Sequence, residues 1–193
     1  MNFKSQTQDV VDDPLTGSIA RESESEFSGA SFELKYQLTD PVADAAGSAL
    51  YLETTLGPSE AAFEGKLIFD KALGPVLLAA NGIAEYELEF VRDGNESKVE
   101  KSLILEPRVA AAYSLSHSVK LGLELRAPFA VSGESKSSTL FGGPVVSYAA
   151  TGFWATLAVL PQLVAFSEQS PDSSLDLDHH ERLQVRIIAG FTL

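Results

Sequence analysis

The densest group of metal-ligand residue types lies near the carboxyl end of the chain. His179 and His180 are adjacent, and Asp176, Asp178 and Glu181 flank them. Imidazole and carboxylate groups bind Zn²⁺ or Cu²⁺, and an exposed loop would allow these side chains to converge. However, adjacent residues of an extended chain point to opposite sides, and no spaced ligand completes the set. We therefore favour a solvated acidic loop tip over a metal centre, and we expect no cofactor.

Motifs of covalent catalysis are lacking. The third histidine, His117, stands alone in a predicted turn, and the chain contains no cysteine, which excludes a thiolate nucleophile and a disulfide framework. The sequence has no Gly-x-Ser-x-Gly motif and no phosphate-binding glycine loop. These features indicate a protein that is not an enzyme.

A larger set of charged residues recurs at every second position and would share one face of a sheet. If that face encloses a lumen, the set could determine ion preference or bind a small solute. Alternatively, it could form a plug of salt bridges that neutralise one another, which is the interpretation we favour. The candidate lumen-lining residues are Glu64, Lys66, Asp70, Glu85, Glu87, Glu106, Arg108, Glu124, Arg126, Arg182 and Arg186.

The elements that position these residues are predicted to be β-strands. Phe32, Leu34 and Tyr36 alternate with Glu33 and Lys35, and this period of two gives a strand one apolar and one charged face. The same pattern continues to the end of the chain and predicts about nine strands and no helix. The expected strands cover residues 32–38, 50–56, 63–70, 76–90, 103–115, 119–129, a segment ending near 148, 153–166 and 183–193.

Residues 137–167 carry no charged side chain, so a transmembrane helix has to be considered there. Gly142, Gly143, Pro144, Gly152 and Pro161 interrupt this run, and its longest clean piece, 153–160, falls well short of the roughly 20 residues that a membrane helix needs. Two strands joined by a tight turn fit the run better.

Strand and connection lengths favour a membrane barrel. Several strands reach the roughly 9 to 11 residues that a tilted strand needs to cross a bilayer. Counted from the carboxyl end, the expected connections alternate in length, as periplasmic turns and external loops do: 167–179, 150–152, 132–138, 116–118, 92–97 and 74–75. The sequence therefore predicts an all-β fold, an antiparallel up-and-down transmembrane-type barrel of about 9 to 10 strands, alone or as part of a larger barrel.

Composition limits the other classes of protein to which the chain could belong. The chain has 193 residues, of which 45% are apolar and 21% charged, so it suits one folded domain. Its net charge of −13 would repel phosphate backbones, and we expect no nucleic-acid partner. Residues 1–26 are polar and acidic and are expected to form a flexible arm, which leaves residues 27–193 as a single barrel domain.

Three segments resemble a poorly characterised, hypothetical or transporter-like family of Gram-negative outer-membrane barrels: 141–148, 153–162 and 181–191. The resemblance extends more loosely from about Phe32 to the end. It implies an outer-membrane barrel but no substrate or catalytic residue. Two features depart from the family: residues 1–8 lead into no signal peptide, and the chain ends in Leu193 where an aromatic residue is usual, with Phe191 as a displaced substitute.

The expected function is accordingly an outer-membrane barrel with a structural or passive solute-passage role, porin-like or transporter-like. Its partners would be the lipid bilayer and a small solute or ion. The missing signal implies a mature form, a truncated chain or a misplaced start. Two alternatives remain open: a soluble lipocalin-like barrel that binds a small hydrophobic ligand, and a barrel-shaped surface enzyme.

Overall fold

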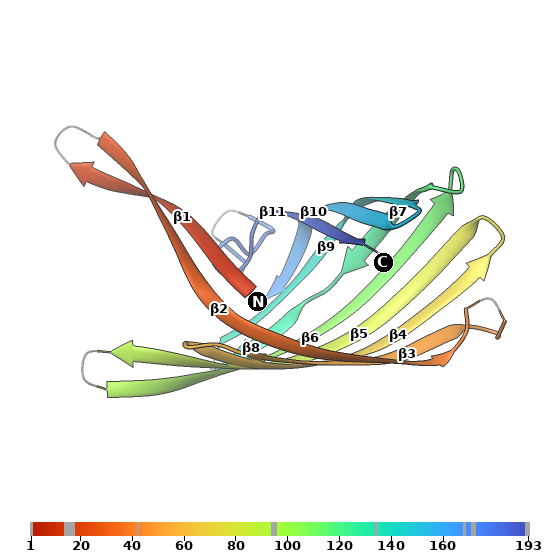
Figure 1. Cartoon of the computed structure of the whole chain (residues 1–193). Coiled ribbons are helices and arrows are strands. Elements are labelled where there is room, and N and C mark those ends of the chain that lie inside the picture. Colours follow the sequence, from red (N-terminus) through yellow and green to blue (C-terminus); the bar gives the residue numbers. More distant parts are fainter. Residues whose placement is uncertain are drawn as a thin grey trace.

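The computed structural model of the chain is built entirely from β-strands (Figure 1). It describes residues 2–13, 18–41, 43–93, 96–133, 135–167, 169–170 and 173–191, with side chains from Ala30 onward except at 92–96. No helix occurs among these residues, and so none that is long and apolar enough to cross a membrane. The strands are β1 (Asn2–Asp13), β2 (Ser18–Thr39), β3 (Gly47–Leu56), β4 (Glu60–Leu73), β5 (Val76–Asp93), β6 (Glu96–Ser114), β7 (Val119–Arg126), β8 (Phe129–Ser132), β9 (Ser135–Ala150), β10 (Phe153–Ser167) and β11 (Leu183–Phe191).

All strands belong to one antiparallel sheet in which chain neighbours pair. The order is β1-β2-β3-β4-β5-β6-β7-β9-β10-β11, and the short β8 pairs with β6 and β9 beside this path. The predicted all-β, up-and-down antiparallel fold is thus confirmed. Figure 1 shows that the sheet curls into a deep trough. Within the described residues no ladder joins β11 to β1 or β2, so the trough is open along one side.

The expected arm of residues 1–26 contributes paired strand where it is described. β1 pairs with the first half of β2, from Asp13 opposite Ser18 to Asn2 opposite Gly29, and β3 pairs with the second half, from Ala30 onward. This hairpin projects from the end of the trough (Figure 1). The polar residues of the segment thus pair with one another through a backbone ladder.

Several connections are shorter than predicted. Gly74-Pro75 is a tight turn as expected, and the positive φ of 59° at Gly74 is a conformation that glycine adopts without strain. The connections expected at 92–97 and 132–138 are instead largely strand, because β5 extends to Asp93, β6 begins at Glu96 and β9 begins at Ser135. Polar alternating residues continue these ladders beyond the apolar part, so hydrophobicity alone placed the ends too early.

The strand expected at 119–129 is divided. β7 ends at Arg126 and β8 begins at Phe129, on either side of Ala127-Pro128. Proline has no N–H for the ladder and restricts the residue before it. The chain is held through this break by the Ala127 N–H, which donates to the Pro107 carbonyl at 3.0 Å, and by the Pro128 carbonyl, which accepts from the Thr139 N–H at 3.2 Å.

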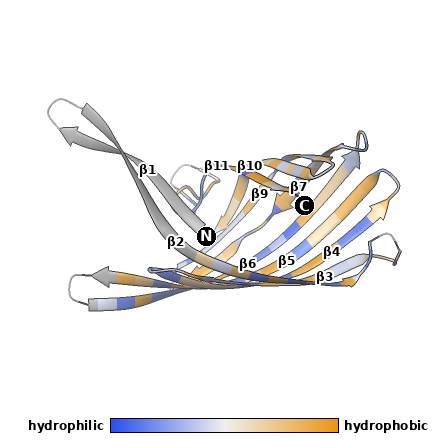
Figure 2. Cartoon of the chain, viewed as in Figure 1, coloured by the Kyte–Doolittle hydropathy of each residue, from blue (hydrophilic) through white to orange (hydrophobic). Residues whose placement is uncertain are grey.

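The two faces of the sheet differ in polarity, as the alternating colours along the strands show (Figure 2). The fully buried apolar residues form a small cluster of Phe141, Ala158 and Leu160. Most large apolar side chains are instead exposed: Ile187 retains 73% and Leu123 retains 65% of its accessible surface. A soluble sheet of this size would bury such residues. The environment of the sheet must therefore explain why its apolar face is exposed.

Candidate functional site

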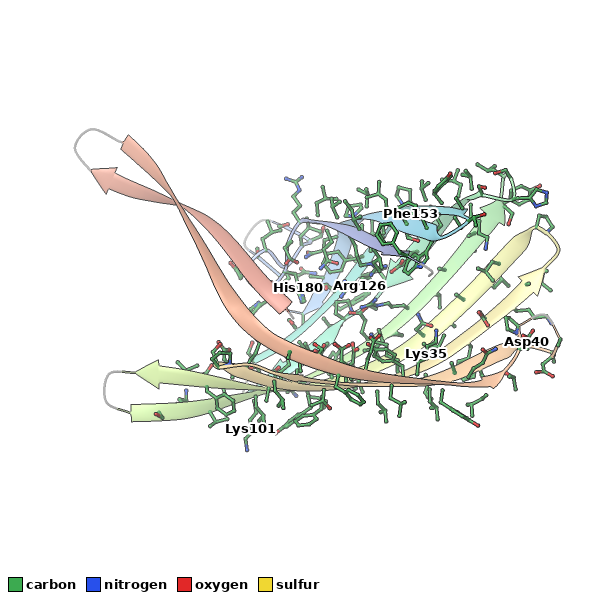
Figure 3. The ribbon with its side chains drawn as sticks, viewed as in Figure 1. Lys35, Asp40, Lys101, Arg126, Phe153 and His180 are labelled. Carbon is green, nitrogen blue, oxygen red and sulfur yellow. The ribbon has the colours of Figure 1, made fainter. Side chains whose placement is uncertain are left out.

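Ion pairs between distant strands identify the concave face of the trough. Nη2 of Arg186 on β11 lies 2.7 Å from Oε1 of Glu124 on β7, although β9 and β10 separate these strands in the sheet. Likewise, Nη1 of Arg126 donates to Oε1 of Gln184 at 2.6 Å. Side chains of non-adjacent strands can meet only across the hollow side of a curved sheet. In Figure 3, Arg126 and His180 lie on this side, whereas Lys101 lies on the opposite, convex side.

Arg126 is the centre of a cluster that we name the arginine wall: Glu106, Arg108, Glu124, Arg126, Gln184 and Arg186. Its guanidinium bonds both Gln184 and Glu106, and Arg108 bonds the other oxygen of Glu106. Glu106 is only 3% exposed. A carboxylate buried to this degree is stable only with paired charges and hydrogen bonds, and here two guanidinium groups provide them.

A second cluster, on β2 to β5, is mainly acidic; this acidic wall comprises Glu33, Tyr51, Glu53, Glu64, Lys66, Glu85 and Glu87. Four of its carboxylates lie opposite one another in successive ladders, Glu33 to Glu53, Glu53 to Glu64 and Glu64 to Glu85. Like charges in directly opposed positions are destabilising. This wall therefore stores electrostatic repulsion among its carboxylates, whereas the one opposed like-charge pair of the arginine wall, Arg108 and Arg126, binds the carboxylate of Glu106.

Two side chains offset part of that repulsion. The Tyr51 hydroxyl contacts Glu33 at 2.8 Å and Glu53 at 2.5 Å, although with one hydrogen it can donate to only one of them at a time. Lys66 Nζ lies 2.6 Å from Glu64 Oε1 and 4.3 Å from the centre of the Tyr51 ring. A small hollow beside them is lined by Glu53, Thr55, Ala62, Glu64, Lys66 and Glu85.

The predicted lumen-lining residues divide between these walls. Glu106, Arg108, Glu124, Arg126 and Arg186 meet in the arginine wall, and Glu64, Lys66, Glu85 and Glu87 lie in the acidic wall. Two residues join neither. Asp70 lies opposite Gly47 near the turn end of β4, and Arg182 is exposed just before β11, where its carbonyl accepts from the Gln162 N–H at 2.9 Å.

Sequence reasoning did not include several residues of the walls among the candidates. Glu33 and Glu53 followed the same alternation and could have been included on that ground. Tyr51 also alternates with leucines, but an aromatic ring gives no sign that it will bridge carboxylates. Gln184 alternates with Arg182 and Arg186 and could have been included on the same ground. Gln162 lies in an apolar run, and its partners lie on a segment that only the fold brings near.

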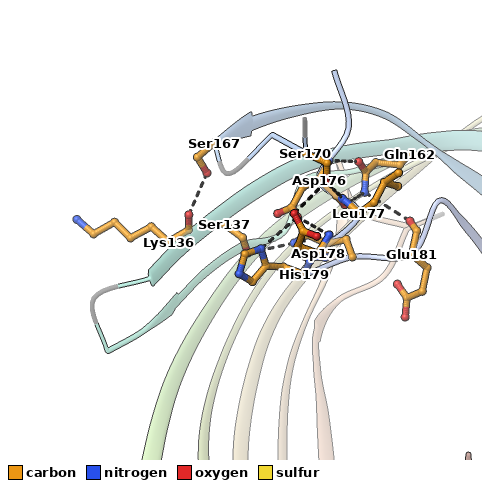
Figure 4. A network of polar contacts seen from close by, with 11 residues as sticks. Lys136, Ser137, Gln162, Ser167, Ser170, Asp176, Leu177, Asp178, His179 and Glu181 are labelled. Carbon is orange, nitrogen blue, oxygen red and sulfur yellow. Dashed lines mark hydrogen bonds and ion pairs between the residues drawn. The ribbon is translucent and has the colours of Figure 1, made fainter. Parts of the chain in front are cut away.

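The histidine-containing segment folds onto the concave face (Figure 4). Asp176 is fully buried, whereas Asp178, His179 and Glu181 are exposed, so the prediction of a solvated loop tip is wrong for Asp176 alone. Its Oδ1 accepts from the His179 N–H at 3.0 Å and contacts His179 Nδ1 at 3.1 Å. The adjacent His180 contacts Ser137 Oγ through Nε2 at 3.1 Å. No group of three or more metal-binding side chains forms among the described residues.

These contacts do not make a catalytic relay. Asp176 pairs with His179, whereas Ser137 pairs with His180, so no single imidazole joins a hydroxyl to a carboxylate. Ser137 is also buried. The arrangement therefore resembles a structural anchor, in which Asp176 is held within the segment by His179 and His180 is held by Ser137 on β9.

The comparisons with known proteins give one match. The model of a family described as a family of unknown function, DUF6662, matches residues 3–193. No curated protein and no solved structure matches the chain. The outer-membrane resemblance of the sequence thus stays a prediction.

Proposed function

From the premise that this chain belongs to the DUF6662 family, we propose that it is an outer-membrane-type β-barrel with a structural or passive solute-passage role. The observation that carries the proposal is the division of a single sheet into an exposed apolar convex face and a concave face of ion pairs. Membrane barrels have this arrangement, and soluble barrels normally have the reverse. The proposed partner is the lipid bilayer.

The height of the convex apolar surface supports this proposal. On β6, outward-facing residues are apolar from Leu103 to Tyr113, and the next outward residue beyond Leu103 is Lys101. Ten residue steps span about 33 Å along a strand, or about 25 Å for a strand tilted by about 40°. An apolar band of about 25 Å is typical of outer-membrane barrels.

Aromatic residues at the turn end of the convex face give further support. The Phe153 ring lies 5.3 Å from Phe191 and 6.5 Å from Tyr148, and these three side chains cluster beside the β9–β10 turn. Aromatic rings favour the interface between lipid and water. Trp154, the neighbour of Phe153 in the chain, lies over Gly190 on the other face of β10 and does not belong to this cluster.

The lipocalin-like alternative requires an apolar interior, and the apolar cluster of Phe141, Ala158 and Leu160 on the concave face is small. The side chains that would line its cavity lie on the convex face, whereas Glu106, Glu124, Thr139 and Gln162 are among the buried polar residues of the concave face. A hydrophobic ligand placed there would displace water from carboxylates and guanidinium groups without replacing their hydrogen bonds, which is costly.

Closure of the barrel requires that the edges of β11 and the second half of β2 become paired. These strands run in the same direction, because eight antiparallel steps separate them. An unpaired edge costs several kcal/mol for each backbone group in hydrocarbon, so the two edges must pair either directly, as parallel strands, or through an antiparallel strand between them. β1 has the required direction, but its register places it beside Ser18–Gly29, and its sequence lacks apolar alternation.

Reconstitution into lipid vesicles tests membrane insertion. Leu123→Arg and Val185→Arg place a charge on the convex face and should each cost about 2–4 kcal/mol near the midplane, measured by urea unfolding in vesicles. Ser102→Arg is the matched control, because Ser102 bonds Glu87 on the acidic wall and an arginine there would meet carboxylates. If the protein stays monodisperse without detergent and tolerates both convex substitutions, the membrane proposal is wrong.

Planar-bilayer conductance separates passage from a purely structural role. The incompletely neutralised carboxylates of the acidic wall should favour cations, so the reversal potential in a salt gradient should have the sign of cation selectivity. A protein that inserts but never conducts has the structural role alone.

A further inference from the structure

The segment 173–182 covers a column of side chains on β9. Ser137, Thr139 and Phe141 alternate along this strand toward the concave face, and all three are buried. Further along the same strand, Ser147 faces the same way but remains partly exposed. The difference in burial indicates that the segment, and not the sheet itself, shields the column from solvent.

A pair of reciprocal hydrogen bonds seats the segment. The Gln162 side-chain amide donates to the Asp176 carbonyl at 2.9 Å and accepts from the Asp176 N–H at 2.7 Å (Figure 4). The Ala165 N–H donates to the Ser174 carbonyl at 2.8 Å, and the Gln162 N–H donates to Arg182. Gln162 faces the hollow, since it lies opposite the buried Phe141.

Asp176 is held through one of its two oxygens. Oδ1 accepts from the N–H groups of Asp178 and His179 and contacts the His179 ring, whereas the buried Oδ2 has no partner among the described atoms. Burial alone would raise the pKa of Asp176, but the bonds from His179 and Asp178 outweigh it and hold this pKa below its ordinary value.

His180 connects the segment to the arginine wall. Its ring lies edge-on to Phe141, with 6.0 Å between the ring centres, and the guanidinium carbon of Arg126 lies 5.7 Å from the centre of the same Phe141 ring. The charged groups that face His180 are Asp176, Glu181 and His179 from the segment and Arg126 from β7. Burial lowers the pKa of His180 below its ordinary value of 6.5, so the ring is neutral at neutral pH.

We propose that residues 173–182 form a latch that is seated in the channel at neutral pH and leaves the concave face on acidification. This inference rests on the proposed function, because unseating alters passage only if the concave face lines a channel. In the seated state, the pKa values of His180 and Asp176 both lie below their ordinary values. The seated state is therefore favoured when the pH is above those ordinary pKa values. As the pH falls below 6.5 toward the lowered pKa of His180, the seated state binds a proton less readily than the unseated state does. Acidification therefore shifts the segment to the unseated state.

Cysteine accessibility tests the latch, because the chain has no cysteine of its own. Thr139→Cys places a reporter under the segment, and His117→Cys, in an exposed turn, normalises for the intrinsic pH dependence of thiol reactivity. With a pyridyl disulfide reagent, the ratio of the Thr139→Cys to the His117→Cys labelling rate should be low at about pH 8 and rise toward about pH 5. The slope should approach tenfold per pH unit for one proton.

Variants identify the groups responsible. Gln162→Met removes the two seating bonds and should give fast labelling already at neutral pH, and His180→Gln should flatten the pH dependence above the range of carboxylates. Asp178→Asn, in the same segment but exposed, is the control and should leave the ratio unchanged. A high ratio at neutral pH in the parent, or a flat ratio down to about pH 5, overturns the latch.

Two further measurements keep the result interpretable. Hydrogen exchange in peptides covering 173–182 of the unmodified chain reports unseating without any cysteine, in case Thr139→Cys does not fold. Conductance recorded on the same preparations separates the two proposals. Conductance with pH-independent accessibility refutes the latch alone, whereas pH-dependent accessibility without conductance refutes passage alone.

Discussion

The acidic and arginine walls arise from the same alternation of apolar and charged residues, yet they differ in how their charges are compensated. On the arginine wall, β11 curls toward β7, so Arg186 reaches Glu124 and Arg126 reaches Gln184 across the hollow. Among the described side chains, no basic strand faces the acidic wall at that distance, and Lys66 forms its ion pair with Glu64 on its own strand. The comparison shows that curvature, and not the sequence pattern alone, decides which charges become neutralised.

Removal of Arg126, the centre of the arginine wall, should give the largest loss of unfolding free energy. Arg126→Met leaves Glu106 buried with one of its two guanidinium partners missing, and a broken buried pair typically costs about 3–5 kcal/mol. Urea unfolding in vesicles measures the loss. Lys98→Met is the control, since the Lys98–Glu100 pair is largely exposed and its removal should leave the midpoint unchanged. Equal midpoints for both variants would mean that the wall is not a stabilising network.

Loss of the contact between β7 and β11 should lower the unfolding free energy by an intermediate amount. A double-mutant cycle of Glu124→Gln and Arg186→Gln should report a coupling of about 1.5–3 kcal/mol, as expected for charged hydrogen bonds. The same unfolding assay measures it. A coupling near zero would show that the two strands do not meet across the hollow, and would remove the main difference between the walls.

Removal of a charge from the acidic wall should change the unfolding free energy by a small amount and with the opposite sign. Glu85→Gln removes one of four carboxylates in mutual opposition and should stabilise the fold by about 0.2–1 kcal/mol. It should also move the bilayer reversal potential toward zero. Glu124→Gln, the same chemical change on the arginine wall, should destabilise. Destabilisation by Glu85→Gln would indicate that this row is neutralised after all.

Alternation sufficed to predict the strands and their two faces, because a strand exposes successive side chains to opposite sides regardless of its neighbours. It could not show which face is concave, since both directions of curvature satisfy the same pattern. Pairs such as Glu124 and Arg186, which are far apart in sequence, depend on that curvature and left no local signal. The burial of Asp176 was missed for a related reason, because its anchor, Gln162, lies on a preceding strand.

The strand boundaries show a second limit of the sequence. The break at Pro128 follows from backbone chemistry and could have been predicted from the residue type. The extension of β5 to Asp93 and of β9 back to Ser135 could not, because polar residues in a hairpin and in a loop have the same composition. Only the pairing of each residue with its neighbour distinguishes the two.

Gln162 meets the Asp176 backbone as a neighbouring strand would, with one donor and one acceptor on a single planar amide. Only asparagine and glutamine carry this combination on a side chain, and asparagine is one methylene shorter. Glutamate has almost the same shape but offers two acceptors when ionised, so it would face the Asp176 carbonyl with like partial charge. Position 162 is thus restricted by the need for one hydrogen-bond donor and one acceptor on the same side chain. Comparisons of residue size or hydrophobicity would not detect this constraint.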